Sequence, residues 1–267
     1  MSIASVSAMD DVNKTEDLGI SLDSNLDEYP EIFNATNSEL NVKENSNLNE
    51  NFESNSNILS MSNDDILAGN NIIPTDFTFA AIQTAVNSAN DGDTITLEEG
   101  TYLNNDNGEI SISKNISFVG VKGKSILDAQ KTSRIFYIDA KSINITDIIF
   151  MNGQANDYGG AIYFNSSISN SNINATYINN TAGQRGGVNY FNKDVSSSNI
   201  AGTYNNNTAN DGGANYFNAV VSSSNITGTY TNNTAIKKSG ANNFNGMVSS
   251  SNINGTYINN NAQEFGG

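Results

Sequence analysis

The acidic residues are the first candidates for chemistry in this 267-residue chain, because it contains no His and no Cys. It therefore has no imidazole base, no thiolate nucleophile, no disulfide and no Cys-ligated metal. A polysaccharide hydrolase would need converging carboxylates, and a lyase would need an Arg or Lys base beside carboxylates that hold Ca²⁺. Asp128, Asp139 and Asp147 lie closer together in sequence than the acids of the C-terminal repeats, and the only two arginines are Arg134 and Arg185.

The positions of these residues do not predict an active site. We expect Asp128 at the end of a strand and Asp147 in a turn, so these carboxylates do not converge. In the C-terminal repeats described below the only acids are Asp194, Asp211 and Glu264, and they fall at different places in their units. The sequence thus predicts no catalytic residue and a protein that is not an enzyme.

Metal, nucleic acid and membrane are also unsupported as partners. The run Asp91-Gly92-Asp93 is typical of a plain Asx turn rather than a Ca²⁺ site, so we expect no metal and no cofactor. With 28 acidic against 12 basic residues the formal net charge is −16, which argues against a protein that follows nucleic-acid phosphates. The sequence contains no run of 18 or more apolar residues, which is the length that a transmembrane helix needs.

The N-terminal part differs from the rest in charge. Residues 9–73 hold 14 acidic residues and 2 lysines among many Asn and Ser, and they show no apolar face. We interpret them as a disordered acidic segment, with a loosely helical stretch around residues 39–52 as the alternative. Residues 1–8 are small and apolar, with Val6 and Ala8 at the spacing of a signal-peptidase site, so we interpret them as the remnant of a signal peptide. The alternative is an ordinary soluble terminus.

The C-terminal half is a repeat. A Gly-Gly pair at residues 159–160 recurs at 186–187 and 212–213, and as Ser239-Gly240, in steps of 27, 26 and 27 residues. The units are residues 159–185, 186–211, 212–238 and 239–265. Each carries short β-rich pieces between Asn, Ser and Gly clusters, which suits three strands and three turns rather than helical hairpins or propeller blades. The repeat predicts an all-β, single-stranded, right-handed parallel β-helix with about 27 residues per coil.

Stacking of identical coils places equivalent residues about 4.8 Å apart in columns. We expect aromatic and aliphatic columns to fill the interior, Asn residues to form a hydrogen-bonded ladder at a turn, and glycines to allow positive φ or close backbone approach at a corner. Ala161 and Phe164 can both point inward only across a bend. Outward positions, Asn215 among them, carry Asn, Ser, Thr and some Tyr. The predicted structural columns are Phe164, Phe191, Phe217 and Phe244; Ile173, Ile200, Ile226 and Ile253; Asn180, Asn207, Asn233 and Asn260; and Gly160, Gly187, Gly213 and Gly240.

Residues 74–158 are predicted to begin the same solenoid, so that the β-helix covers 74–267. Phe79, Ile82, Val86 and Ala89 lie at helical spacing, which predicts an amphipathic helix over residues 77–89 that covers the first coil. The last unit stops at Gly266-Gly267, where a further Gly-Gly turn begins. We therefore expect a C-terminally incomplete β-helix with a fraying last coil and end-to-end self-association.

The stretch from Ala80 to Phe164 resembles the opening of the adhesin-like proteins of methanogenic archaea. The shared features are Asp91-Gly92-Asp93-Thr94-Ile95, Gly100-Thr101-Tyr102, Ile116-Ser117-Phe118-Val119-Gly120, Ile148-Ile149-Phe150-Met151-Asn152-Gly153 and Gly159-Gly160-Ala161-Ile162. The Gly-Gly-Ala-Ile turn, combined with the Tyr-x-x-Asn turn, is similar to the repeat of the chlamydial polymorphic outer-membrane proteins, which have a pectin-lyase-like fold. Later units depart from it, with Asn in place of Ile. The resemblance implies a secreted, surface-displayed parallel β-helix with a binding role.

Residues and resemblance together predict a non-enzymatic, cell-surface, adhesin-like protein. Its expected partner is an unknown glycan or cell-surface protein, bound through the side of the β-helix. Two alternatives remain open at this point, namely a structural spacer rod of the cell envelope and a relative of polysaccharide lyases or hydrolases.

Overall fold

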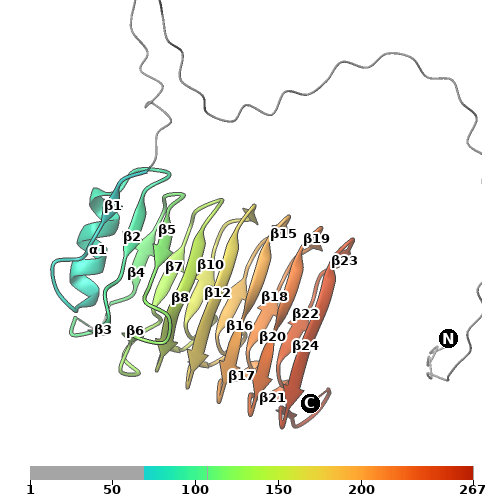
Figure 1. The fold of residues 1–267 in the computed structure, drawn as a ribbon. Helices are drawn as coiled ribbons and strands as arrows, with labels where there is room; N and C mark the ends of the chain where they lie inside the picture. Colours follow the sequence, from blue (N-terminus) through green and yellow to red (C-terminus); the bar gives the residue numbers. More distant parts are fainter. Residues whose placement is uncertain (1–68, 107, 267) are drawn as a thin grey trace, which may run out of the picture. The chain divides into compact units, whose positions relative to one another are not determined.

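The computed structural model describes residues 69–106 and 108–266, which form a parallel β-solenoid of about seven coils with roughly 27 residues per coil (Figure 1). The predicted all-β solenoid is thus confirmed. The predictions of a signal-peptide remnant at residues 1–8 and of disorder over residues 9–68 lie outside the described residues. Residues 69–73, which were predicted to belong to the disordered segment, instead contribute a strand to the first coil.

Four parallel sheets run along the solenoid. The first contains the longest strands: β1 (Asn71–Ile72), β2 (Thr94–Thr96), β5 (Ser117–Val119), β8 (Asn144–Met151), β12 (Asn172–Ile178), β16 (Asn199–Asn205), β20 (Asn225–Thr231) and β24 (Asn252–Ile258), joined by β3 (Gly100–Leu103) and β6 (Ser125–Asp128). The second contains β4 (Ile110–Ile112), β7 (Phe136–Ile138), β10 (Ile162–Phe164), β14 (Asn189–Phe191), β18 (Asn215–Phe217) and β22 (Asn242–Phe244).

The other two sheets consist of shorter strands. The third contains β11 (Ile168–Ser169), β15 (Val195–Ser196), β19 (Val221–Ser222) and β23 (Val248–Ser249). The fourth contains β9 (Gln154–Ala155), β13 (Thr181–Ala182), β17 (Thr208–Asp211), β21 (Thr234–Lys238) and β25 (Asn261–Ala262). The pairing follows the sequence repeat, since Phe164 lies beside Phe191 and Ile173 beside Ile200.

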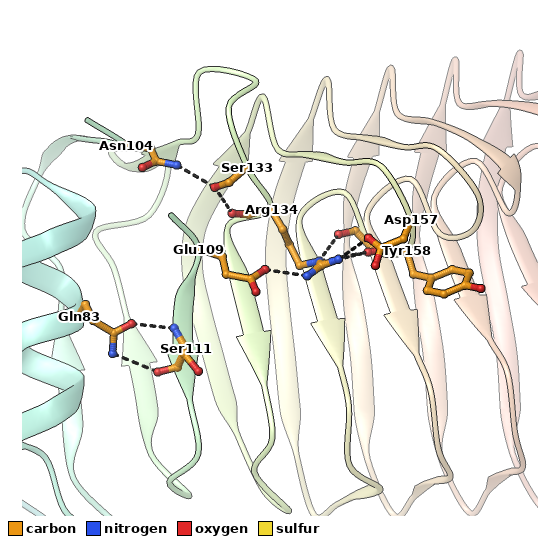
Figure 2. A network of polar contacts seen from close by, with 9 residues as sticks. Gln83, Asn104, Glu109, Ser111, Ser133, Arg134, Asp157 and Tyr158 are labelled. Carbon is orange, nitrogen blue, oxygen red and sulfur yellow. Dashed lines mark hydrogen bonds and ion pairs between the residues drawn. The ribbon is translucent and has the colours of Figure 1, made fainter. Parts of the chain in front are cut away.

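A helix covers the first coil, as predicted. Helix α1 (Phe79–Ser88) begins at Thr78, whose hydroxyl accepts the backbone N–H of Ala81. At its other end the ammonium group of Lys114 donates to the backbone carbonyls of Val86, Asn87 and Ala89, which the helix itself leaves unpaired. The amide of Gln83 pairs with both backbone groups of Ser111 on β4, so the helix also closes the edge of the second sheet (Figure 2).

The glycine pairs serve both expected purposes. The first glycine of each pair has positive φ, 62° at Gly159 and 64° at Gly186, and Ser239 takes the same conformation in the last unit. A Cβ on the second glycine would collide with the backbone of the next coil, at 2.3 Å from the carbonyl oxygen of Gly187 in the case of Gly160. The bend that lets Ala161 and Phe164 both point inward follows this corner, at Ala161, whose carbonyl accepts the N–H groups of both Ile135 and Phe136.

The Asn ladder is present at the turn between the first and fourth sheets. The side-chain oxygen of Asn207 accepts both the backbone N–H and the amide of Asn180, at 2.9 and 3.1 Å, and Asn233 does the same for Asn207. Each ladder amide also donates to a backbone carbonyl, that of Tyr177 in the case of Asn207. The buried ladder therefore satisfies four hydrogen-bonding groups per coil without water.

The interior differs from the prediction in one column, and it contains a further column whose direction was not predicted. Asn215, which was predicted to point outward, is fully buried, and its amide joins Asn189 and Asn242 in a second ladder. Tyr177, Tyr204 and Tyr230 also point inward and are fully buried. The Phe and Ile columns fill the interior as predicted, except that Ile253 is 38% exposed in the last described coil.

Candidate functional site

Asp128, Asp139 and Asp147 do not converge on a common site. Asp128 ends β6 and accepts from the backbone of Gln130 and the amide of Asn152. Asp147 was predicted to lie in a turn, but it lies inside β8, where it has a φ of 59° at a β-bulge. Asp139 follows β7 and accepts from Asn165 and Ser166. Within residues 69–106 and 108–266, no three His, Cys, Asp or Glu residues are grouped so that they could hold a metal ion.

The Asp91-Gly92-Asp93 run forms a turn that holds backbone groups. The carboxylate of Asp93 accepts the backbone N–H groups of Asn90 and Asn70, both at 2.7 Å. The bond from Asn90 lowers the pKa of Asp93 most, with a further contribution from Asn70. Asp91 accepts from the backbone and amide of Asn115 in the next coil. These carboxylates are therefore engaged in linking the first coils.

Arg134 is a structural clamp. Its guanidinium lies 2.6 Å from Glu109 and 2.7 Å from Asp157, and it also donates to the backbone carbonyls of Tyr158 and Gly159 (Figure 2). Its side chain is only 10% exposed. The three charged residues come from positions just before β4, β7 and β10, so the clamp joins three successive coils. Because two carboxylates and two backbone carbonyls occupy its N–H groups, Arg134 is not placed to act as a base on a bound molecule.

A row of tyrosines covers the outer face of the second sheet. The rings of Tyr137, Tyr163, Tyr190 and Tyr216 stack in sequence, with centroids 5.3, 5.3 and 5.5 Å apart. Tyr158 packs on Tyr190 at 4.5 Å. Tyr190 and Tyr216 are only 3% exposed, and burial raises the pKa of both hydroxyls. Because the ring faces cover one another, this row is a second packed layer and offers no open aromatic face to a sugar.

A groove lies beside the third sheet and is a candidate binding site. We call it the serine groove. It has a volume of about 480 Å³, and its polar lining includes Lys141, Ser166, Ser169, Asp194, Ser196 and Ser222. The short strands β11, β15 and β19 place it by alternation, since Ile168, Val195 and Val221 point inward and the serines that follow them point outward. The hydroxyls of these serines thus repeat at the strand spacing.

Charged groups stand at the edges of this row of hydroxyls. One carboxylate oxygen of Asp194 accepts the backbone N–H of Val220 at 3.0 Å, which fixes its position. Lys141 takes part in no ion pair among the described residues. Asp139 accepts from Ser166 and from Asn165, and these two bonds lower the pKa of Asp139. A carboxylic acid that remains ionised in this way is poorly suited to protonate a leaving group.

The sequence contained part of the signal for this groove. Ser196, Ser222 and Ser249 directly follow Val195, Val221 and Val248 at the repeat steps of 26 and 27 residues, so the row of hydroxyls could be recognised from the sequence. Lys141 and Asp194 could not be assigned to this groove from the sequence, because each occurs in a single coil and has no counterpart in the repeat.

Comparisons of this chain with protein-family models, with curated proteins and with solved structures found no match. The resemblance to adhesin-like proteins and to the chlamydial repeat therefore stays a prediction. Among the described residues, no helix is both long and apolar enough to span a bilayer.

Proposed function

We propose that the chain is a non-enzymatic, adhesin-like protein of the cell surface that binds a glycan through the serine groove. The observation that carries this proposal is the groove itself, with its row of serine hydroxyls between one lysine and one fixed carboxylate. Its volume of about 480 Å³ falls within the range of roughly 300–1,000 Å³ that small-ligand sites occupy.

The chemistry of the lining favours a sugar over an apolar ligand. A serine hydroxyl both donates and accepts, an ammonium group such as that of Lys141 only donates, and a carboxylate such as that of Asp194 only accepts. Sugar hydroxyls present the same mixture of donors and acceptors along a chain. Repetition of the serines along the solenoid axis would let successive sugar units make equivalent contacts.

A structural spacer rod is the second candidate, and the continuous ladders favour it. Asn172, Asn199, Asn225 and Asn252 form an outward amide ladder on the first sheet with bonds of 2.8 Å. These bonds pair the outward amides with one another rather than leaving them for a ligand. In a pure spacer the serine groove would bind nothing.

A glycan array probed with the full chain tests the proposal, followed by calorimetric titration of any glycan that binds. Ser196→Tyr fills the groove from an outward position, and we expect it to weaken binding at least tenfold. Thr229→Tyr, an exposed position on β20 in the first sheet, is the matched control and should leave affinity unchanged. Absence of binding across the array, or binding that Ser196→Tyr does not affect, would contradict the proposal and favour the spacer.

A further inference from the structure

One turn of the solenoid presents an asparagine outward in successive coils. This turn column consists of Asn152, Asn179, Asn206, Asn232 and Asn259, each with φ between 52° and 57°. Asparagine tolerates this left-handed conformation better than most residues. Each of the last four directly precedes a member of the Asn ladder, so the exposed residue bends the chain and the buried one holds it.

Three members of the column lie in the acceptor motif for N-linked glycosylation. Asn179, Asn206 and Asn232 each begin the sequence Asn-Asn-Thr. Asn152 and Asn259 have the same backbone conformation without the motif, because Gln154 and Asn261 replace the threonine. The motif Asn-x-Ser/Thr marks a possible glycan acceptor but does not decide whether a glycan fits there.

The asparagines that begin these motifs differ in whether their amide nitrogen already donates a hydrogen bond within the fold. Nine motifs begin within the described residues, at Asn115, Asn144, Asn165, Asn174, Asn179, Asn206, Asn225, Asn232 and Asn254. In four of them the amide nitrogen already donates within the fold, namely Asn115 to Asp91, Asn144 to Ser117, Asn165 to Asp139 and Asn225 to Asn199. Asn174 and Asn254 lie inside strands.

In the part of the chain that the structure describes, the motif asparagines of the turn column neither donate from their amide nitrogen nor lie inside a strand. Asn179, Asn206 and Asn232 are exposed, and none of the side-chain hydrogen bonds among the described residues involves them. A sugar on their amide nitrogen would extend into solvent and break no bond of the fold. On Asn225, by contrast, it would disturb the 2.8 Å bond to Asn199 in the outward ladder.

We propose that Asn179, Asn206 and Asn232 are the acceptor sites for N-linked glycans in this protein. A lipid-linked oligosaccharide would be the co-reactant. A bond forms between the Asn amide nitrogen and the first sugar carbon, while the bond from that carbon to the lipid phosphate oxygen breaks. The phosphate leaves with the electron pair, and the amide nitrogen loses one proton. This inference rests on the cell-surface location in the proposed function, because the chain must meet a membrane-bound transferase.

The placement keeps glycans away from the serine groove. The turn column lies between the first and fourth sheets, whereas the groove lies beside the third. Glycosylation and binding at the groove are therefore independent properties. Loss of groove binding would leave the glycans in place, so the two proposals fail separately.

The test is secretion of the full chain, with an added secretion leader, from a yeast host, followed by mass mapping of glycopeptides in the soluble product. We expect glycans on Asn179, Asn206 and Asn232, and none on Asn144 or Asn225. Thr208→Val should remove the glycan from Asn206 alone. Asn261→Thr, which creates the same motif in the same turn, should add one at Asn259. The proposal would be overturned if Asn179, Asn206 and Asn232 carried no glycan, or if Asn225 and Asn206 were glycosylated to the same extent.

Discussion

The first coils and the repeated coils fill the same solenoid interior in different ways. Before residue 159, Phe136 meets Phe118 at an interplanar angle of 44° and Phe150 at 84°. From residue 159 onward the rings stack nearly parallel, at 10° for Phe164 and Phe191 and 8° for Tyr204 and Tyr230. Irregular packing requires a particular residue at each site, whereas a ladder requires only that each coil repeat the previous one.

At the boundary between the two regions one buried polar atom lacks a hydrogen-bond partner. The amide of Asn189 donates to Asn215 in the next coil, but the previous coil places Ile162 in register with Asn189. The side-chain oxygen of Asn189 is consequently buried without a partner. A polar ladder inside a core is thus stable along its length and weakest where it meets an apolar coil.

The largest expected effect is on the Asn ladder, which only the repeated coils possess. Asn207→Ala removes four hydrogen bonds. The backbone N–H of Asn180 and the carbonyl of Tyr177 lose their ladder partner, at about 1–3 kcal/mol each, and the two amide–amide bonds contribute about 0.5–1.5 kcal/mol each. We expect a loss of at least about 4 kcal/mol in the free energy of unfolding, measured by denaturant titration. Asn206→Gly, at the exposed neighbour with positive φ, should change it by less than about 0.5 kcal/mol. Similar midpoints for both variants would show that the ladder is not stabilising.

The next prediction compares the loss of stability when one ring is removed from the parallel stack of the repeated coils or from the irregular packing of the first coils. Phe217→Ala and Phe136→Ala each remove a fully buried ring, which costs about 3–5 kcal/mol. We expect the two losses to agree within about 1.5 kcal/mol, because the geometry of an aromatic pair adds only about 0.5–1.5 kcal/mol to the burial of area. Thr229→Ala, at an exposed position, is the control; Asn215 is unsuitable because it is buried. A much larger loss at Phe217 would mean that parallel stacking itself stabilises the repeated coils.

Alkaline pH should distinguish the two regions, because only the repeated coils bury a tyrosine column. Burial raises the pKa of Tyr177, Tyr204 and Tyr230 above the usual value of 10.0. Their contribution to stability is complete below pH 10 and falls as the pH rises, since the unfolded chain ionises first. At pH 11 we expect a loss of about 1.4 kcal/mol for each tyrosine.

The matched variant replaces all three of these tyrosines by Phe. It should abolish this part of the alkaline loss while leaving stability at pH 7 nearly unchanged, because the Tyr177 and Tyr204 hydroxyls are buried without partners. Unfolding midpoints at pH 8 and pH 11 provide the measurement. If the variant loses as much stability as the parent chain, the inward tyrosines are not responsible.

Acidic pH should have the smallest effect on stability, and this effect should lie in the first coils. The lowered pKa of Asp93 means that its contribution to stability is present above the unfolded value near 3.8 and is lost as the pH falls below it. We expect faster amide exchange at Asn70 and Asn90, the two donors to Asp93, when the pH falls from 5 to 3. Intrinsic exchange rates must be corrected for pH. Asp93→Asn should remove this pH dependence, and exchange that responds equally in the variant would exclude Asp93 as the cause.

The sequence by itself determined the architecture and the register of the coils. In a parallel in-register stack each contact recurs after one coil, so the 26- or 27-residue steps in the sequence are also the steps in space. The covering helix was equally readable, since Phe79, Ile82 and Val86 lie on one helical face. The glycine corners followed from the steric requirements of a tight turn.

Only the tertiary structure decided the direction that the chain takes at the corners between strands. Side chains alternate along a strand, but corner residues with positive φ, such as Asn179 and Ser197, interrupt that alternation between strands. Asn215 lies two residues before Phe217 in β18, so alternation within that strand places both inward, although Asn215 was predicted to point outward. Asp147, which was expected in a turn, lies at a bulge inside β8. The serine groove likewise depends on Lys141 and Asp194, which belong to different coils. The repeat period sets distances along the axis, whereas the backbone conformation at the corners sets directions around it.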